Sequence, residues 1–346
     1  MTPSFPVNHD EPRAEELHTR SIIIQALDFT PEAKFTPAIY PALKASGVTA
    51  LHLTVARPFY TLHEAFESLY HYYTVIDDLG AQLIQIARTA DDIRRAKLMN
   101  RVAVILGLQN TTLIGDNLHL LTILARLGIR IMQLTYQNRN RVGSGCNDPL
   151  DQGLTPFGER VIVEMNRLGI LIDLSHVGPQ TTMEAIEQSK APCAFTHTCA
   201  HALFPHIRNK TDTHLQALAD KGGVIGVAAY SPFYHAHQRP TLEDYLNQIE
   251  YLVDVVGSAH VGIGLDLVFD RDPAYHAAVK QRYPEVVTSY DWDTIYPVGL
   301  ESITHLPRIT RGLVTRGFSN QDVERIMGRN FLRLFARVWK ASARKA

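Results

Sequence analysis

The sequence has few of the features that mark membrane proteins, nucleic-acid-binding proteins or disulfide-stapled secreted domains. No stretch approaches about eighteen uninterrupted apolar residues, the length that a spanning helix needs, so we expect no membrane association. The formal net charge of −1 argues against a dedicated nucleic-acid binder, which would carry a basic face. The three cysteines, Cys146, Cys193 and Cys199, show no CxxC spacing, and an odd number fits a reducing compartment better than a disulfide framework.

The first twenty residues lack the apolar run and the cleavage pattern of a secretory signal. We therefore interpret residues 1–20 as a polar N-terminal segment and expect a cytoplasmic protein. The sequence also contains no internal repeat and no low-complexity segment, and 45% of its residues are hydrophobic, enough for a large core.

From residue 21 onward, short β-branched runs alternate with longer amphipathic stretches, several of which end in glycine. Eight runs separated by helices predict an α/β fold, a (β/α)8 TIM barrel, as a single domain over residues 21–346 with a helical segment at its C-terminus. A doubly wound open sheet is the alternative, although no glycine-rich phosphate loop follows the first run. The predicted strands are 21–27, 49–55, 102–108, 129–135, 169–174, 193–196, 223–229 and 260–265. We expect long loops at 138–153 and 269–297, where they would shape the substrate mouth.

Two histidines follow successive predicted strands, His176 in ILIDLSH and His197 in AFTHT. Strand ends in an α/β barrel converge on one mouth, so two imidazoles delivered there predict a metal platform. Four further polar residues lie at predicted strand ends, which makes a functional site more plausible than coincidence: Asp28, Gln109, Tyr136 and Asp266.

Each candidate also has an ordinary structural interpretation. Asp28 is placed like a helix cap or turn residue, and Gln109 like an amide that satisfies loop backbone. His52, at the end of the second predicted strand, is better explained as a core or rim histidine than as a ligand. Arg208, in the loop RNKTD, has a planar guanidinium that suits a substrate carboxylate, but it could instead pair with Asp212.

Longer motifs carry a family resemblance that spans nearly the whole chain. The sequence resembles the renal (membrane) dipeptidase family of the amidohydrolase superfamily in LTPFGERVIVEMNRLGILIDLSHVGPQTTMEAI, PCAFTHTCAHALFPHIRNKTD, GGVIGV, HVGIGLD and IMGRNFLRLF. Members of that family are (β/α)8 barrels that use two zinc ions to hydrolyse dipeptides and related small amides. The resemblance implies that His176 and His197 are ligands of the second metal, that Arg208 grips the substrate carboxylate, and that Asp266 handles the proton.

The sequence departs from the family at the remaining metal ligands. The family's first strand ends in Asp-Gly-His-Asn-Asp, whereas this chain reads Ile-Gln-Ala-Leu-Asp over residues 24–28, so Ala26 replaces a ligand histidine. The bridging glutamate falls at Gln109, and the histidine of the fourth strand at Tyr136. An alanine binds no metal, and a neutral amide is a poor bridge between two dications. Tyr136 would then stand near the reacting carbonyl, as a catalytic and substrate-binding residue.

These substitutions change the expected cofactor. The first metal site keeps only Asp28 and is expected to be empty. The second site keeps His176 and His197, with Gln109 or Asp28 as a weak third contact, and predicts one divalent metal, zinc, in a site with an open position. A metal-free barrel that keeps both histidines for packing or hydrogen bonding is the alternative.

The predicted function follows from what is kept and what is lost. We expect a family enzyme with weak or no ordinary dipeptidase activity. It would act on a small carboxylate-bearing substrate derived from an amino acid or peptide, with specialised metabolism as its setting. Hydrolysis, or acid–base elimination or isomerisation, is the expected chemistry. The alternatives are an inactive binding or partner protein and an ordinary zinc dipeptidase. The expected partner is a small molecule, with no nucleic acid or membrane, and a homodimer is possible.

Overall fold

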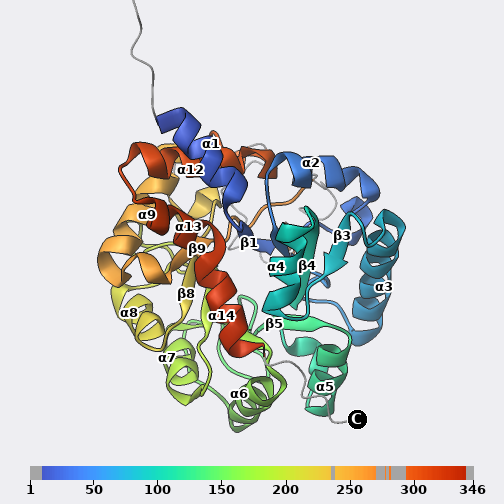
Figure 1. Cartoon of the computed structure of the whole chain (residues 1–346). Helices are drawn as coiled ribbons and strands as arrows, with labels where there is room; N and C mark the ends of the chain where they lie inside the picture. The colour runs from blue at the N-terminus through green and yellow to red at the C-terminus, as the bar shows by residue number, and fades with distance from the viewer. Residues whose placement is uncertain (1–9, 235–237, 270–276, 278–279, 282–293, 340–346) are drawn as a thin grey trace, which may run out of the picture.

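The sheet is closed, because β2 (Ala50–Thr54) pairs with β1 (Ile24–Asp28) on one side and with β4 (Val102–Leu108) on the other. Eight parallel strands thus form a barrel, which the computed structural model shows with helices around it (Figure 1). The structure describes residues 10–234, 238–269, 277, 280–281 and 294–339. The predicted (β/α)8 barrel is confirmed, and the doubly wound alternative is wrong because an open sheet would leave β2 or β4 as an edge.

The other barrel strands lie close to the predicted runs. They are β5 (Ile129–Gln133), β6 (Leu171–Asp173), β7 (Ala194–Thr198), β8 (Val224–Val227) and β9 (Val261–Ile263). Three strand pairings are irregular: the register of β1 against β2 shifts between Gln25 and Asp28, that of β4 against β5 between Leu106 and Gly107, and that of β7 against β8 between Phe195 and Thr198. Such irregularities re-aim side chains at barrel rims.

The helices begin and end with ordinary local signals. Thr61, Thr89 and Thr241 each form a capping box at the start of a helix, and α6 ends at Gly169 in the left-handed conformation. The described helices are α1 (Asp10–Arg20), α2 (Tyr40–Ala45), α3 (Leu62–Leu79), α4 (Ala90–Leu98), α5 (His119–Arg126), α6 (Pro156–Leu168), α7 (Pro179–Gln188), α8 (Asp212–Asp220), α9 (Leu242–Val256), α12 (Leu306–Thr315), α13 (Asn320–Glu324) and α14 (Asn330–Val338), with a π-helical turn over Arg325–Arg329 and short 3-10 turns at Glu32–Lys34, Pro37–Ile39, Thr112–Ile114, Ser231–Phe233, Ser258–His260 and Ile303–His305.

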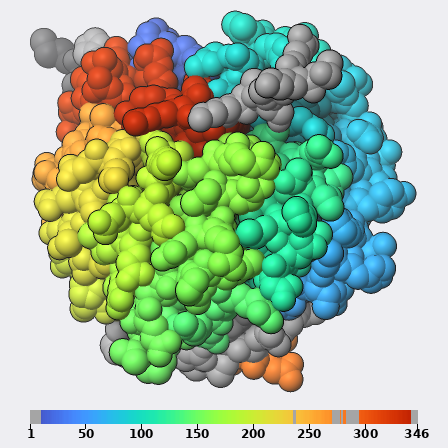
Figure 2. Space-filling view, turned by 90° about the horizontal axis from the view of Figure 1, so that it is seen from below, coloured from blue at the N-terminus to red at the C-terminus, as the bar shows by residue number. Residues whose placement is uncertain are grey.

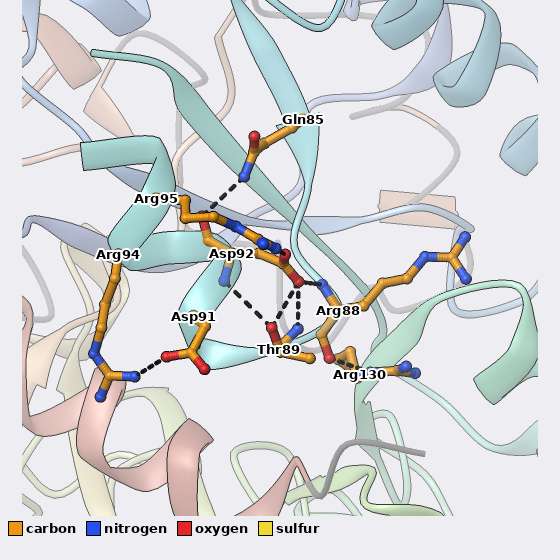
Figure 3. Close-up of polar contacts among 8 residues, drawn as sticks. All are labelled: Gln85, Arg88, Thr89, Asp91, Asp92, Arg94, Arg95 and Arg130. Carbon is orange, nitrogen blue, oxygen red and sulfur yellow. Dashed lines mark hydrogen bonds and ion pairs between the residues drawn. The ribbon is translucent and has the colours of Figure 1, made fainter. Parts of the chain in front are cut away.

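One strand was not predicted. Strand β3 (Ile84–Ile86) pairs with the first residues of β4 and lies outside the closed ring. It leads into α4, where the Asp92 carboxylate accepts hydrogen bonds from the Thr89 hydroxyl and from the backbone N–H of Arg88 (Figure 3). The side chain of Gln85 on β3 donates to the Asp92 carbonyl over 2.8 Å, so β3 and the start of α4 are held as one unit.

The C-terminal helix covers the amino-terminal end of the barrel. Phe331 and Phe335 of α14 pack in one buried cluster with inward-facing residues such as Ile24 and Ala103, and α14 crosses the centre of the view in Figure 1. Figure 2 shows the outer surface built by the green and yellow segments, with the red C-terminal segment along its upper edge. The opposite end, where β-strand carboxyl ends meet, is left for the site.

The two remaining expectations about segments concern the N-terminus and the loops. Helix α1 buries Ala14 and Leu17 and packs against α12. The loop predicted at 138–153 is described, and its β-structure consists of isolated bridges: Asn138 with Tyr136, Gly143 with Leu154 and Gly145 with Val177. Most of the loop predicted at 269–297 lies outside the described residues. No helix in the described part of the chain has the length and apolar character needed to cross a membrane.

Candidate functional site

Two imidazoles face each other at the carboxyl end of the barrel. His176 follows β6 and His197 belongs to β7, and their Nε2 atoms lie 2.9 Å apart. Both side chains are buried, and burial, followed by the charge of Arg208, lowers the pKa of each imidazole well below its usual value. Both rings are therefore neutral near pH 7, the form that binds a metal.

A chain of hydrogen bonds fixes the tautomer of His197. The Thr196 hydroxyl donates to the Asp173 carboxylate over 2.6 Å, so its oxygen accepts the proton of His197 Nδ1, 2.8 Å away. Asp173 also accepts from the Ser175 hydroxyl and from two backbone N–H groups. The Nε2 atom of His197 consequently keeps its lone pair and presents it to His176.

His176 is held differently. Its ring stacks on Tyr136, with centroids 4.3 Å apart and planes inclined by 25°. Its Nδ1 atom has no hydrogen-bond partner within the part of the chain that is described. Without a cation, His176 Nε2–H donates to His197; with a cation, both Nε2 lone pairs would turn to it.

The expected carboxylate grip, Arg208, is completely buried. Its terminal nitrogens donate to the carbonyl oxygens of Ser175 and His197, and its Cζ atom lies 5.1 Å from the centroid of the Phe233 ring. Its Nε has no partner among the described residues. The alternative pairing with Asp212 is not observed, since that carboxylate accepts from the Tyr251 hydroxyl instead.

The two acidic candidates lie on adjacent strand ends. A parallel bridge joins Asp28 to Leu267, and the backbone N–H of Asp266 donates to the Leu27 carbonyl. Burial raises the pKa of each carboxyl to about 7. Asp28 accepts from the backbone of Thr30, whereas Asp266 adopts a positive φ of 59°, an uncommon conformation for a residue other than glycine.

The two weak metal candidates do not join the histidines. The Gln109 side-chain amide donates to the Thr54 hydroxyl over 3.0 Å, and Asp28 turns to Thr30. Among the described residues, no three His, Cys, Asp or Glu side chains are arranged to hold a metal ion. His52 lies inside the barrel, where its Nδ1 bonds to the Ala26 carbonyl and burial lowers its pKa to about 4.

A test of metal fit separates one cation from two. Nitrogen ligands at about 2.0–2.1 Å in tetrahedral geometry would stand roughly 3.3 Å apart, close to the observed 2.9 Å between the two Nε2 atoms. The donor set thus fits one cation with further positions open to water or substrate. It does not fit the family's pair, because Ala26 and Gln109 supply neither an imidazole nor a bridging carboxylate.

Sequence reasoning missed three residues that support this centre. Asp173 and Thr196 orient His197, and a signal was available in the aspartate that precedes His176 by three positions. Lys210 is buried, donates to the Val177 carbonyl over 2.7 Å and lies 5.1 Å from the Phe195 ring. Burial, and then the charge of Arg208, lower the pKa of this ammonium group to about 7. A second cation two residues after Arg208 was visible in RNKTD.

A cavity of about 800 Å³ lies beside the centre. Its described lining comes from the loops that follow β2, β4 and β5, together with Gln281, and it includes Tyr136. Tyr136 therefore forms a wall shared by the cavity and the histidine pair.

The chain matches the family described as membrane dipeptidase, peptidase family M19, over residues 38–275 and 283–346. It is 29% identical over 272 residues to dipeptidase tcpJ of Claviceps purpurea (strain 20.1), covering 78% of this chain and 58% of that protein. It is 32% identical over 259 residues to the uncharacterized dipeptidase C965.12 of Schizosaccharomyces pombe, covering 72% and 56%. The chain thus spans little more than half the length of these two relatives.

Solved structures share the whole fold. An amidohydrolase from Pseudomonas aeruginosa superposes with a TM-score of 0.87 at 31% identity and covers 94% of this chain and 99% of that one. A metallo peptidase from Rhodobacter sphaeroides, liganded with a phosphinate mimic of the dipeptide L-Ala-D-Ala, has a TM-score of 0.76 at 20% identity and covers 92% and 100%. At 20% identity this second likeness shows the fold alone.

Proposed function

The chain belongs to the membrane dipeptidase family, peptidase family M19, and from this premise we propose that it is an enzyme with an altered, single-metal centre. Its substrate would be a small carboxylate-bearing compound derived from an amino acid or peptide, and ordinary dipeptide hydrolysis would be weak or absent. The observation that carries the proposal is the combination of a paired His176 and His197 with an Arg208 that is buried beside them and forms no ion pair with a carboxylate of the described residues.

The argument for an anionic substrate begins with the cost of a buried charge. A guanidinium removed from water is expensive unless it is paired and hydrogen-bonded. Arg208 binds two backbone carbonyls, leaves Nε unsatisfied and forms no ion pair with a carboxylate of the described residues. A substrate carboxylate would complete both the charge balance and the hydrogen bonding.

Asp266 is the proposed acid–base group. A carboxyl with a pKa of about 7 takes up and releases a proton near neutral pH, which suits proton transfer to or from a substrate atom. Tyr136, stacked on His176, would position the reacting end of the substrate against the pair. A divalent cation, with zinc the first candidate, would be held by the Nε2 atoms of His176 and His197 and would supply Lewis acidity there.

Metal analysis and turnover together test this proposal. Protein purified without added metal should carry up to one equivalent of a divalent cation per chain, and His176→Ala or His197→Ala should lose it. His119→Ala, at an exposed histidine of α5, is the matched control and should retain the metal. Asp266→Asn should also retain the metal, while turnover across a panel of dipeptides and N-acyl amino acids falls by about 10²–10⁴-fold.

Three results would contradict the proposal. Two tightly bound equivalents would show that Ala26 and Gln109 do not prevent a dinuclear centre. A wild-type rate typical of efficient enzymes on ordinary dipeptides would refute the loss of dipeptidase function. Protein that binds no metal and turns over nothing in the panel would favour a binding protein instead.

A further inference from the structure

Hydrogen bonds between loops hold part of the lining of the cavity beside Tyr136 in place. Asn140 Nδ2 lies within 3.0 Å of three acceptors, the side chains of Asn110 and Thr111 and the carbonyl of Leu134. Asn110 in turn donates to the Pro58 carbonyl over 2.8 Å. Three separate loops are therefore tied together beneath the cavity, which keeps its shape in place for a ligand.

The charged side chains among the described residues that line the cavity are all basic. The described residues that line it include Arg139 and Arg141 but no aspartate or glutamate. Arg139 makes one side-chain hydrogen bond, to Ser144 over 3.2 Å, and neither arginine forms an ion pair with a described carboxylate. Asp148 binds the backbone N–H of Arg139 rather than its guanidinium. Two guanidinium groups at one cavity, with no fixed counter-charge among the described residues of its lining, favour an anionic ligand.

A chain of contacts links this cavity to Arg208 through the histidines. Tyr136 lines the cavity and stacks on His176, His176 meets His197, and the His197 carbonyl accepts from Arg208. A substrate that is held at Arg208 and reacts at the histidine pair would have the cavity beside Tyr136 available for its other end.

We propose that Arg139 and Arg141 bind a second anionic group of the substrate, so that the substrate class is a dicarboxylic, peptide-like compound. The second carboxylate is then a side-chain group on the part of the molecule remote from the end that Arg208 holds. This inference rests on the proposed function, and it assigns the specificity of the same site to a cavity that shares only Tyr136 with the proposed catalytic groups.

Two dipeptides that differ only at one functional group test the assignment. L-glutamyl-L-alanine carries the second carboxylate, whereas L-glutaminyl-L-alanine carries an amide of nearly the same shape. Binding of each is measured by titration calorimetry for the wild type, for Arg139→Gln with Arg141→Gln, and for Arg126→Gln, with product analysis of every sample. Arg126 is exposed at the end of α5 and does not line the cavity, so its substitution controls for the loss of a positive charge outside the cavity.

The wild type should bind the glutamyl compound about tenfold more tightly than the glutaminyl one, as expected for a charge-assisted pair. The double variant should reduce this ratio to within about twofold, Arg126→Gln should leave it unchanged, and added salt should lower it because exposed charges are screened. Equal binding of both compounds by the wild type, or a ratio that survives the double substitution, overturns the assignment and leaves the proposed function standing. Failure of the wild type to bind either compound overturns the assignment and the peptide-like substrate class together.

Discussion

His176 and His197 contact each other, but different neighbours hold the two rings in place. This difference determines how firmly each ring could bind a cation. His197 is fixed through Thr196 by the buried carboxylate of Asp173, which keeps the lone pair on the Nε2 atom that the ring presents. His176 is positioned by stacking on Tyr136 and leaves Nδ1 without a described partner. We infer that His197 is the firmer of the two ligands and that His176 retains more freedom to rotate.

Strand-end residues were accessible to sequence reasoning, whereas their supporting partners were not. His176, His197 and Asp266 follow apolar runs, so their arrival at one mouth is dictated by the barrel. The roles of Thr196 and Lys210 depend on the irregular register of β7 and on which cation is buried behind it. Hydrogen-bond partners of this kind are set by tertiary packing, which leaves no periodic signal in one sequence.

Lys210 should make stability depend on pH in a direction that can be worked out. Its folded pKa of about 7 lies below the ordinary value of 10.5, so between these values the unfolded chain holds a proton that the folded chain lacks. Stability should rise with pH through this window, by at most about 1.4 kcal/mol per pH unit, and be insensitive to this group below it.

Lys210→Met keeps an unbranched side chain and removes the titration. Urea unfolding at pH 7.5 and 9.5 should show the wild type gaining roughly 1–3 kcal/mol relative to this variant as pH rises. Lys190→Met, at an exposed lysine, should follow the wild type at both values. Parallel pH profiles for wild type and Lys210→Met would show that Lys210 titrates normally.

At the scale of elements, strands that are continuous β-branched runs could be predicted, and those defined by pairing could not. The run at residues 102–108 coincides with β4, because every residue is buried and apolar or small. Strand β3 has three residues, and it exists because the start of β4 offers a free edge before β5 begins to pair. The packing of α14 over the amino-terminal end of the barrel likewise depends on tertiary contacts. The amphipathic pattern of the segment predicted only that it forms a terminal helix.

The end of α14 should contribute measurably to stability. Trp339, directly after the helix, is buried, stacks on Phe335 with centroids 4.1 Å apart and donates its indole N–H to the Arg130 carbonyl over 3.1 Å. Trp339→Ala should cost about 3–5 kcal/mol in urea unfolding, and Trp339→Phe, which keeps most of the apolar contact, about 1–2 kcal/mol. Leu98→Ala, at a leucine that is 85% exposed, should change stability by less than about 0.5 kcal/mol. An equal loss of unfolding free energy in all three variants would show that the end of α14 is not specifically packed.

At the scale of the whole molecule, the barrel of the family is kept, and we propose that the chemistry of its mouth is altered. The barrel is stabilised by its buried core and by the helices packed around it, and both are present here. Substitution of metal ligands therefore need not disturb folding. Ala26 is wholly buried in the inner cluster, with His52 bonded to its carbonyl. A small apolar side chain beside His52 thus occupies the position that the resembling family gives to a ligand histidine. The sequence indicated this replacement but not the contact with His52.

Restoring the lost ligands tests whether those two positions account for the altered centre. Ala26→His returns an imidazole near Asp28, and Gln109→Glu returns a carboxylate able to bridge two cations. Each change alone should add little metal, because the histidine would lack a shared anion and the glutamate would face an incomplete site. Together they should raise the metal content toward two equivalents, a non-additive result expected of residues that act as a unit.

Since Ala26 lies beside His52, the pair is also made with His52→Ala to provide room for the new ring. Metal content and dipeptide turnover are measured for wild type, singles, pair and triple variant. Turnover should stay low even where metal is gained, because Tyr136 remains on His176 where the resembling family has a histidine. If the folded pair and triple variants gain no metal, the ligand losses at Ala26 and Gln109 are not what excludes the second cation.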